Sequence, residues 1–158
     1  MGEAPVETAS HLAWQGCNAL LIEDDLLTAD MARRAVAESC PGLNLTVVGC
    51  GDATLEWLDD STAKNQPPPH IILLDMKFPK LDGLAVLRRL RIHTVTRDVP
   101  VVGFSAEYIQ EDVLMSYRVG VNSLVAKPVD QQQFTKFLCD QLAYWAHPQQ
   151  RQFEFNAR

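Results

Sequence analysis

One short apolar stretch, from Ile71 to Asp75, constrains the fold more than any other part of the sequence. Four large aliphatic residues stand in a row, three prolines precede them at 67–69, and Pro79 follows. Such a run is typical of a strand that is buried on both faces inside a parallel sheet. In open α/β sheets, ligands bind at the carboxyl ends of the strands. We therefore expect Asp75, at the end of this strand, to face a crevice at the edge of the sheet.

Four further apolar runs alternate with stretches whose apolar residues recur at helical spacing. The runs cover residues 18–22, 43–48, 99–104 and 123–126. Four helical stretches cover 26–40, 83–92, about 109–120 and 130–146. A fifth begins with Asp52 as its N-cap and ends before the prolines at 67–69. Five strands that alternate with five helices predict a fold of the α/β class, a mostly parallel sheet with helices on both faces, because consecutive parallel strands need helical crossovers.

Length and charge limit the classes of protein to consider. The 158 residues suit a single core, so we expect one domain over 17–146, an N-terminal arm over 1–16 and a C-terminal tail over 147–158. No apolar run approaches the roughly 20 residues that cross a bilayer, and the first 16 residues lack the apolar centre of a signal peptide. The net charge of −6 disfavours nucleic acid and anionic membranes as partners.

The cysteines and arginines are interpreted as structural features. The four cysteines are widely spaced and form no C-x-x-C pair, which favours buried reduced thiols in a cytoplasmic protein over a disulfide framework or a zinc site. Arg88, Arg89 and Arg91 form a basic cluster, which we interpret as the solvated face of a helix. The sequence therefore predicts a cytoplasmic protein and gives no reason to expect DNA binding.

Polar residues follow four of the predicted strands. Glu23 and Asp24 follow the first strand, Asp75 ends the third, Ser105 follows the fourth and Lys127 follows the fifth. If these ends converge, three carboxylates share a small space, and their repulsion must be relieved by protonation or by a cation. Mg²⁺ suits such oxygen ligands together with a substrate phosphate. With Lys127 as the cation and Ser105 as a hydroxyl donor, Asp75 could accept a phosphoryl group as a nucleophile.

The same residues resemble the receiver domain of response regulators. The match rests on four motifs, each after a predicted strand: Glu23-Asp24-Asp25, Asp75 with Pro79 and Asp82-Gly83, Ser105-Ala106, and Lys127-Pro128. The resemblance covers roughly residues 17–146. It implies a five-stranded, doubly wound, flavodoxin-like sheet with strand order 2-1-3-4-5.

The resemblance also implies a role for each matching residue. Asp75 would be the phosphoacceptor. The implied Mg²⁺ ligands are Asp75, Asp24, Glu23 through a water molecule, and the backbone carbonyl of Lys77. Lys127 would bind the phosphate and form an ion pair with Asp75, and Ser105 would move to bind a phosphoryl oxygen. The Lys127-Pro128 peptide bond would be cis.

Three features depart from the family pattern. Leu124 stands three residues before Lys127, where the family usually has an aromatic switch residue. Lys77 and Glu107 flank access to the phosphoryl group, and we expect them to form an ion pair that hinders attacking water. Finally, no output domain is expected after the receiver, so the signal would leave through a surface.

The C-terminal part of the sequence points to one subgroup of this family. The segment 120–130, followed by Phe134 and Tyr144-Trp145, is similar to the single-domain regulators that partner bacterial phytochromes and related sensor histidine kinases. In that group the fourth and fifth helices and the fifth strand form a homodimer face. The interface candidates implied here are Leu124, Phe137 and Tyr144.

Two other classes of function compete with a phosphorylated receiver. A degenerate receiver would act as a constitutive binding or dimerisation module, which Leu124 and the missing output domain would suit. An enzyme is a poorer fit. A haloacid-dehalogenase-like phosphatase needs a second acid where Lys77 stands, and a flavodoxin-like FMN protein needs a phosphate loop where Glu23 and Asp24 stand.

Overall fold

The computed structural model describes residues 14–49, 51–76, 83–107 and 110–146. Within these ranges five strands alternate with five helices, as predicted. The strands are β1 (Asn18–Ile22), β2 (Asn44–Val48), β3 (Ile71–Asp75), β4 (Val101–Ser105) and β5 (Ser123–Ala126). The helices are α2 (Leu26–Ser39), α3 (Gly51–Ala63), α4 (Gly83–Ile92), α5 (Gln110–Val119) and α6 (Gln131–Trp145).

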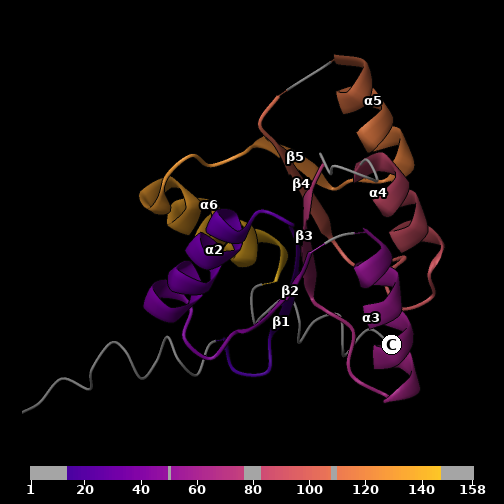
Figure 1. The fold of residues 1–158 in the computed structure, drawn as a ribbon, viewed down its shortest axis with the longest axis horizontal. Helices are drawn as coiled ribbons and strands as arrows, with labels where there is room; N and C mark the ends of the chain where they lie inside the picture. Colours follow the sequence, from indigo (N-terminus) through magenta and orange to yellow (C-terminus); the bar gives the residue numbers. More distant parts are fainter. Residues whose placement is uncertain (1–13, 50, 77–82, 108–109, 147–158) are drawn as a thin grey trace, which may run out of the picture.

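The strands form one parallel sheet in the order β2-β1-β3-β4-β5, which confirms the predicted fold class and strand order. Figure 1 shows this sheet running between two layers of helices. The register places Asp75 opposite Phe104, and Ser105 opposite Ala126. The carboxyl ends of the central strands therefore meet at one edge of the sheet, where a doubly wound fold binds its ligands.

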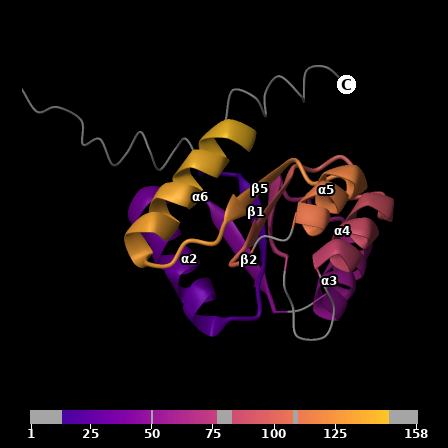
Figure 2. The same ribbon diagram turned by 90° about the horizontal axis from the view of Figure 1, so that it is seen from above.

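Alternate residues of the strands build two cores, one on each face of the sheet. Leu21, Leu73 and Phe104 face the layer of α2 and α6, whereas Leu20 and Leu74 face the other helical layer. Figure 2 shows α2 and α6 together on one side, and α3, α4 and α5 on the other. Burying each such side chain stabilises the fold by about 1.5–3 kcal/mol, which is why the four aliphatic residues of β3 are all buried.

Acidic residues or a glycine stand at several of the helix ends. Asp25 and Asp130 cap α2 and α6 at their N-termini, and Gly120, with φ of 121°, follows the end of α5. Asp52 was expected to precede its helix as the N-cap, but α3 begins at Gly51 and already includes Asp52. Asp52 therefore lies in the first turn, where its carboxylate faces the positive end of the helix dipole.

Arg91 is not part of a solvated basic face, which corrects the interpretation of the arginine cluster. Its guanidinium donates to the carbonyl oxygens of Val99 and Gly120, at 2.7 and 2.8 Å, and to Asn122 Oδ1 at 2.8 Å. Arg88 and Arg89, by contrast, are exposed. Arg91 thus fastens the end of α4 to the segments that lead into β4 and β5.

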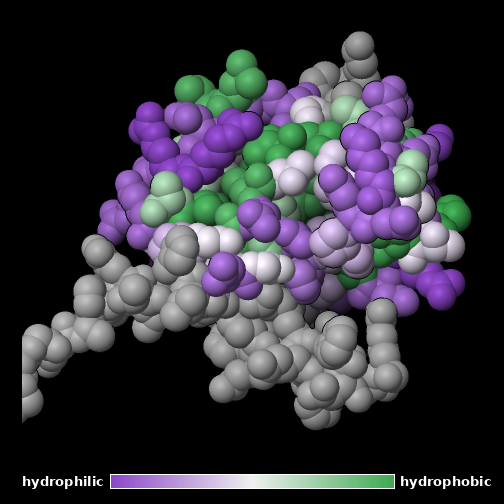
Figure 3. Space-filling view, turned by 90° about the horizontal axis from the view of Figure 1, so that it is seen from below, coloured by the Kyte–Doolittle hydropathy of each residue, from purple (hydrophilic) through white to green (hydrophobic). Residues whose placement is uncertain are grey.

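The surface is mixed in polarity. Figure 3 shows hydrophilic side chains over the two helical layers and a more hydrophobic strip between them. None of the helices in the described ranges is long and apolar enough to span a bilayer.

Candidate functional site

Two buried carboxylates lie where β1 and β3 end. Glu23 directly follows β1 and is 1% exposed, and Asp75 is the last residue of β3 and is 5% exposed. Asp24, the next residue along the chain from Glu23, is exposed. An ionised carboxylate is costly to bury unless opposite charges or hydrogen-bond donors replace the lost water. The chemistry of the site therefore depends on what compensates these groups.

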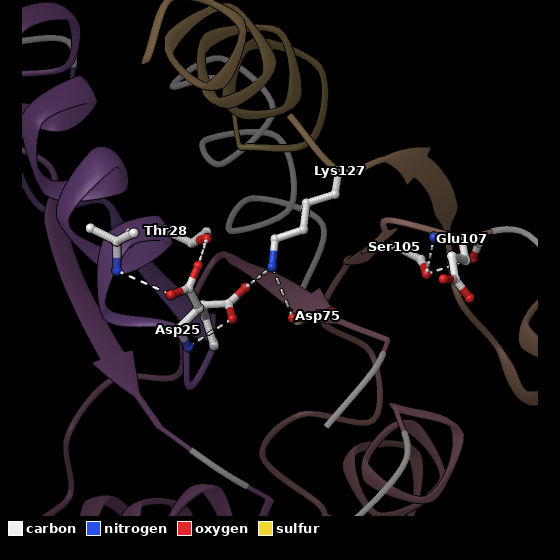
Figure 4. A network of polar contacts seen from close by, with 8 residues as sticks. Asp25, Thr28, Asp75, Ser105, Glu107 and Lys127 are labelled. Atoms are coloured by element: carbon white, nitrogen blue, oxygen red, sulfur yellow. Dashed lines mark hydrogen bonds and ion pairs between the residues drawn. The ribbon is translucent and has the colours of Figure 1, made fainter. Parts of the chain in front are cut away.

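Lys127 supplies the compensating charge. Its Nζ lies 3.2 Å from Glu23 Oε2 and 3.3 Å from Asp75 Oδ2, so one ammonium bridges both buried acids (Figure 4). The backbone N–H of Lys127 donates to the carbonyl of Ser105 at 2.9 Å, which fixes this position at the sheet edge. Burial disfavours the charged form of Lys127, but the negative charges of Asp75 and Glu23 outweigh it and raise its pKa.

Glu23 is only partly satisfied by its surroundings. Its Oε1 accepts the backbone N–H of Asp25 at 2.9 Å. Its Oε2 faces the Nζ of Lys127 at 3.2 Å, an ammonium that it shares with Asp75. Burial raises the pKa of Glu23 to about 7; the Asp25 N–H and Lys127 oppose this rise, whereas the charge of Asp75 adds to it. A cation bound at Oε2 would favour the ionised form.

The three acids predicted as metal ligands do come together. Glu23, Asp24 and Asp75 each offer one carboxylate oxygen, and these oxygens lie within 4.8 Å of one another. Three carboxylates against one ammonium leave up to two uncompensated negative charges. Mg²⁺ fits both the charge and the donors, because it prefers a few carboxylates completed by water and phosphate. The buried Glu23 Oε2, which shares its ammonium with Asp75, fits such an ion as well.

Ser105 lies at the predicted strand end but is turned away from the acids. It is the last residue of β4 and is 5% exposed. Its Oγ donates to the carbonyl of Glu107 at 2.7 Å and accepts the N–H of Glu107 at 3.3 Å. Figure 4 shows Ser105 pointing to Glu107 rather than to Lys127. The hydroxyl must therefore leave Glu107 before it can donate to a group on Asp75.

Two further sequence-based expectations change or remain open. The Lys127-Pro128 bond was expected to be cis, but none of the described peptide bonds is cis, in line with the preference of about 0.5–1 kcal/mol for trans. Lys77 lies outside the described residues. Its carbonyl as a metal ligand and its ion pair with Glu107 therefore stay predictions.

The three interface candidates differ in what they offer a partner. Tyr144 on α6 is 65% exposed and stacks edge-to-face on Trp145. Leu124 in β5 is half-buried. Phe137, however, is 7% exposed, because it lies on the same helix face as Phe134 and packs edge-to-face against that ring. Phe137 thus belongs mainly to the core.

Gly83, which the sequence analysis named only as part of a motif, also packs closely against the backbone beside the site. Its N–H donates to the carbonyl of Met76 at 2.9 Å, directly after Asp75. A Cβ on Gly83 would collide with the backbone of Met76, so a larger residue would displace the backbone there. The signal was a glycine at the first position of a helix, where a residue with a Cβ is ordinarily preferred.

Comparisons with known proteins agree with this geometry. The model of the response regulator receiver domain family matches residues 19–138. Response regulator Rcp1 of Synechocystis sp. is 27% identical over 127 residues, which are 80% of this chain and 86% of Rcp1. The Mn²⁺-bound structure of Rcp1 superposes with a TM-score of 0.70 at 26% identity, over 82% of this chain and 94% of Rcp1.

Two other solved structures are also similar. The phosphorylated cyanobacterial phytochrome response regulator RcpA has a TM-score of 0.73 at 25% identity, over 82% of this chain and 93% of RcpA. The bacteriophytochrome response regulator RtBRR is 36% identical with a TM-score of 0.65, over 82% of this chain and 80% of RtBRR. With acids, hydroxyl and lysine at the carboxyl edge of the sheet and the family model matched across them, the chain belongs to the response regulator receiver domain family.

Proposed function

We propose that Asp75 accepts a phosphoryl group from a sensor histidine kinase in the presence of Mg²⁺. The observation that carries this proposal is the buried carboxylate of Asp75 at the end of β3, 3.3 Å from the ammonium of Lys127 and grouped with two further acids. An oxygen of Asp75 would attack the phosphorus of a phosphohistidine. The P–N bond would break, its electron pair would leave on the imidazole nitrogen, and an acyl phosphate would remain on Asp75.

The other residues of the site would assist this transfer without being consumed. Glu23, Asp24 and Asp75 would hold Mg²⁺, which neutralises charge so that an anionic phosphoryl group can approach an anionic carboxylate. Lys127 would exchange part of its ion pairing for a phosphoryl oxygen, and Ser105 would rotate from Glu107 to donate to another. In this proposal the chain is a phosphoacceptor and not a catalyst that turns over.

We infer the class of partner from the proteins that this chain resembles. Rcp1, RcpA and RtBRR support a sensor kinase as the source of the phosphoryl group, with a bacterial phytochrome as the first candidate. Such an exchange would take place in the cytoplasm. The formal charge of −6 argues against nucleic acid as a further partner.

A homodimer is proposed on the face of α5, β5 and α6. Tyr144 and Leu124 would contribute to it, together with Leu114 and Tyr117, which are exposed on α5. Sedimentation velocity of the full chain would test this: Tyr144→Ala should shift the protein toward monomer, whereas Lys136→Ala, on an exposed position of the same helix, should not. Equal dimer fractions in both variants and the wild type would remove Tyr144 from the interface.

A degenerate receiver remains the second candidate, because Leu124 replaces the aromatic residue of the usual switch. In that case Asp75 would accept no phosphoryl group, and the protein would act through constitutive contacts. The two candidates differ in one measurable property, the covalent modification of Asp75.

Intact-protein mass spectrometry after incubation with acetyl phosphate and Mg²⁺ decides between them. One adduct of about 80 Da is expected, and it should disappear with EDTA and in Asp75→Asn. Asp25→Asn is the matched control, because Asp25 caps α2 outside the metal cluster and asparagine also caps helices. A folded wild type without any adduct would favour the degenerate module.

A further inference from the structure

A pair of thiols joins the two helices of one layer. Cys40, the C-cap of α2, and Cys139 of α6 are 99 positions apart in the sequence, yet their Sγ atoms lie 3.9 Å apart. The pair exists because α2 and α6 pack side by side on the same face of the sheet (Figure 2). Neither sulfur takes part in the acidic site.

The geometry suits a covalent bond better than a metal. A disulfide requires about 2.05 Å between the sulfurs, so these, now 3.9 Å apart, must close by roughly 1.9 Å for the bond to form. Soft metals generally need three or four ligands from a protein. Among the described residues, the group of acids, cysteines or histidines that could hold a metal consists of Glu23, Asp24 and Asp75. Neither Cys40 nor Cys139 belongs to it.

The two thiols differ in access to solvent. Cys40 is 1% exposed, and burial raises its pKa to about 12. Cys139 is only partly buried, so it is the thiol that an oxidant in solution can meet first. Exposure therefore sets the order: Cys139 reacts with the oxidant, and Cys40, whose Sγ lies 3.9 Å away, resolves the product, slowly because its raised pKa leaves little thiolate.

We propose that Cys40 and Cys139 form a disulfide when the protein meets hydrogen peroxide, tying the end of α2 to α6. The Cys139 thiolate attacks a peroxide oxygen, the O–O bond breaks, hydroxide leaves and takes a proton, and a sulfenic acid forms. The sulfur of Cys40 then attacks the sulfenic sulfur, the S–O bond breaks and a second water leaves. Two thiols are thereby oxidised by two electrons, and peroxide is reduced to two waters.

The reaction should be independent of phosphorylation. Cys40 lies at the far end of α2 from Asp25, and 14 helical residues span about 20 Å. Acetyl phosphate should therefore label Asp75 equally in the oxidised and reduced protein. For this reason the disulfide and the proposed function can fail separately.

The experiment counts free thiols in the full chain. The reduced protein is treated with a small excess of hydrogen peroxide, quenched, unfolded and alkylated with N-ethylmaleimide, and its adducts are counted by mass spectrometry. The reduced protein should carry four adducts, one for each cysteine in the sequence, and the oxidised protein two. Peptide mapping without reductant should yield one cross-linked peptide that contains Cys40 and Cys139.

Three variants separate this pair from other oxidation. Cys139→Ser and Cys40→Ser should lose the cross-link, whereas Cys17→Ser, which removes the third thiol described, should keep it. Each variant is used only if its far-UV circular dichroism matches the wild type, and Cys139→Ser, at a partly buried position, is the less disruptive of the pair. Four adducts after peroxide, a cross-link between other cysteines, or sulfinic acid on Cys139 without a cross-link would each overturn the proposal.

Discussion

Replacing Arg91 by methionine should destabilise the domain more than any other single change of an arginine in the described residues. The side chain makes six contacts of hydrogen-bond length, 2.7 to 3.2 Å, with four backbone carbonyls and Asn122 Oδ1. Methionine keeps much of the apolar stem but removes every donor. Burial lowers the pKa of Arg91, and the charge of Asp98 opposes this change. The hydration that the guanidinium loses on burial therefore offsets part of the stability that its hydrogen bonds contribute.

The expected loss in free energy of unfolding follows from the shortest hydrogen bonds of Arg91. Four of the six are 2.9 Å or shorter, to Val99, Gly120 and Asn122. Because the freed acceptors are only partly buried and can bind water, each bond is taken at the lower end, about 0.5–1 kcal/mol. The expected loss in free energy of unfolding is therefore about 2–4 kcal/mol. For a domain of this size the melting temperature should fall by on the order of 10 °C.

Urea unfolding followed by circular dichroism is the assay, because a change in midpoint at constant slope isolates stability. Arg88→Met is the matched control on the same helix; Arg88 is exposed, so the control should stay within about 0.5 kcal/mol of the wild type. Arg91→Lys should recover little, since an ammonium cannot reproduce the planar fork of donors. A loss below about 0.5 kcal/mol in Arg91→Met would refute the reasoning.

Three further predictions concern the acidic site and its supports. Because the pKa of Glu23 is raised to about 7, the carboxylate is lost as pH falls through that value, and Mg²⁺ affinity measured by calorimetry should rise about tenfold from pH 6 to pH 8; the rise should be absent in Glu23→Gln. Gly83→Ala should cost about 1–3 kcal/mol in urea unfolding and slow acetyl phosphate labelling, because its Cβ would collide with the Met76 backbone beside Asp75; unchanged labelling would mean that the loop adapts. Asp25→Ala should lower stability by about 1 kcal/mol through loss of the α2 cap, while Asp25→Asn should nearly match the wild type in the same unfolding assay.

The fold could be predicted because the signals for it are local. Ile71 to Leu74 are all buried, as their continuous apolar character indicates, and parallel strands then require the helices between them. The convergence of Asp75 and Lys127 followed from the same argument, since both stand at carboxyl ends of strands. Helix starts were less certain: Asp52 is a good capping residue, yet the helix begins before it.

Contacts that depend on tertiary packing could not be predicted. Arg91 looked like its exposed neighbours, because nothing in the sequence shows that the two segments leading into β4 and β5 turn their carbonyls toward it. Ser105 was placed correctly, but its bond to Glu107 depends on the turn after β4. Cys40 and Cys139 are far apart in sequence and meet only because α2 and α6 pack together.

The charge balance of the site links its individual contacts. In the structure a single ammonium on Lys127 is shared between Glu23 and Asp75, at nearly equal distances of 3.2 and 3.3 Å. Three ionised carboxylates and one ammonium sum to −2, which is the charge that one divalent cation neutralises. Lys127 would then no longer be needed to compensate Glu23, and its ammonium would become available to an incoming phosphoryl group. The raised pKa of Glu23 fits this order, because an acid that is partly protonated near neutral pH releases its proton when a second cation binds.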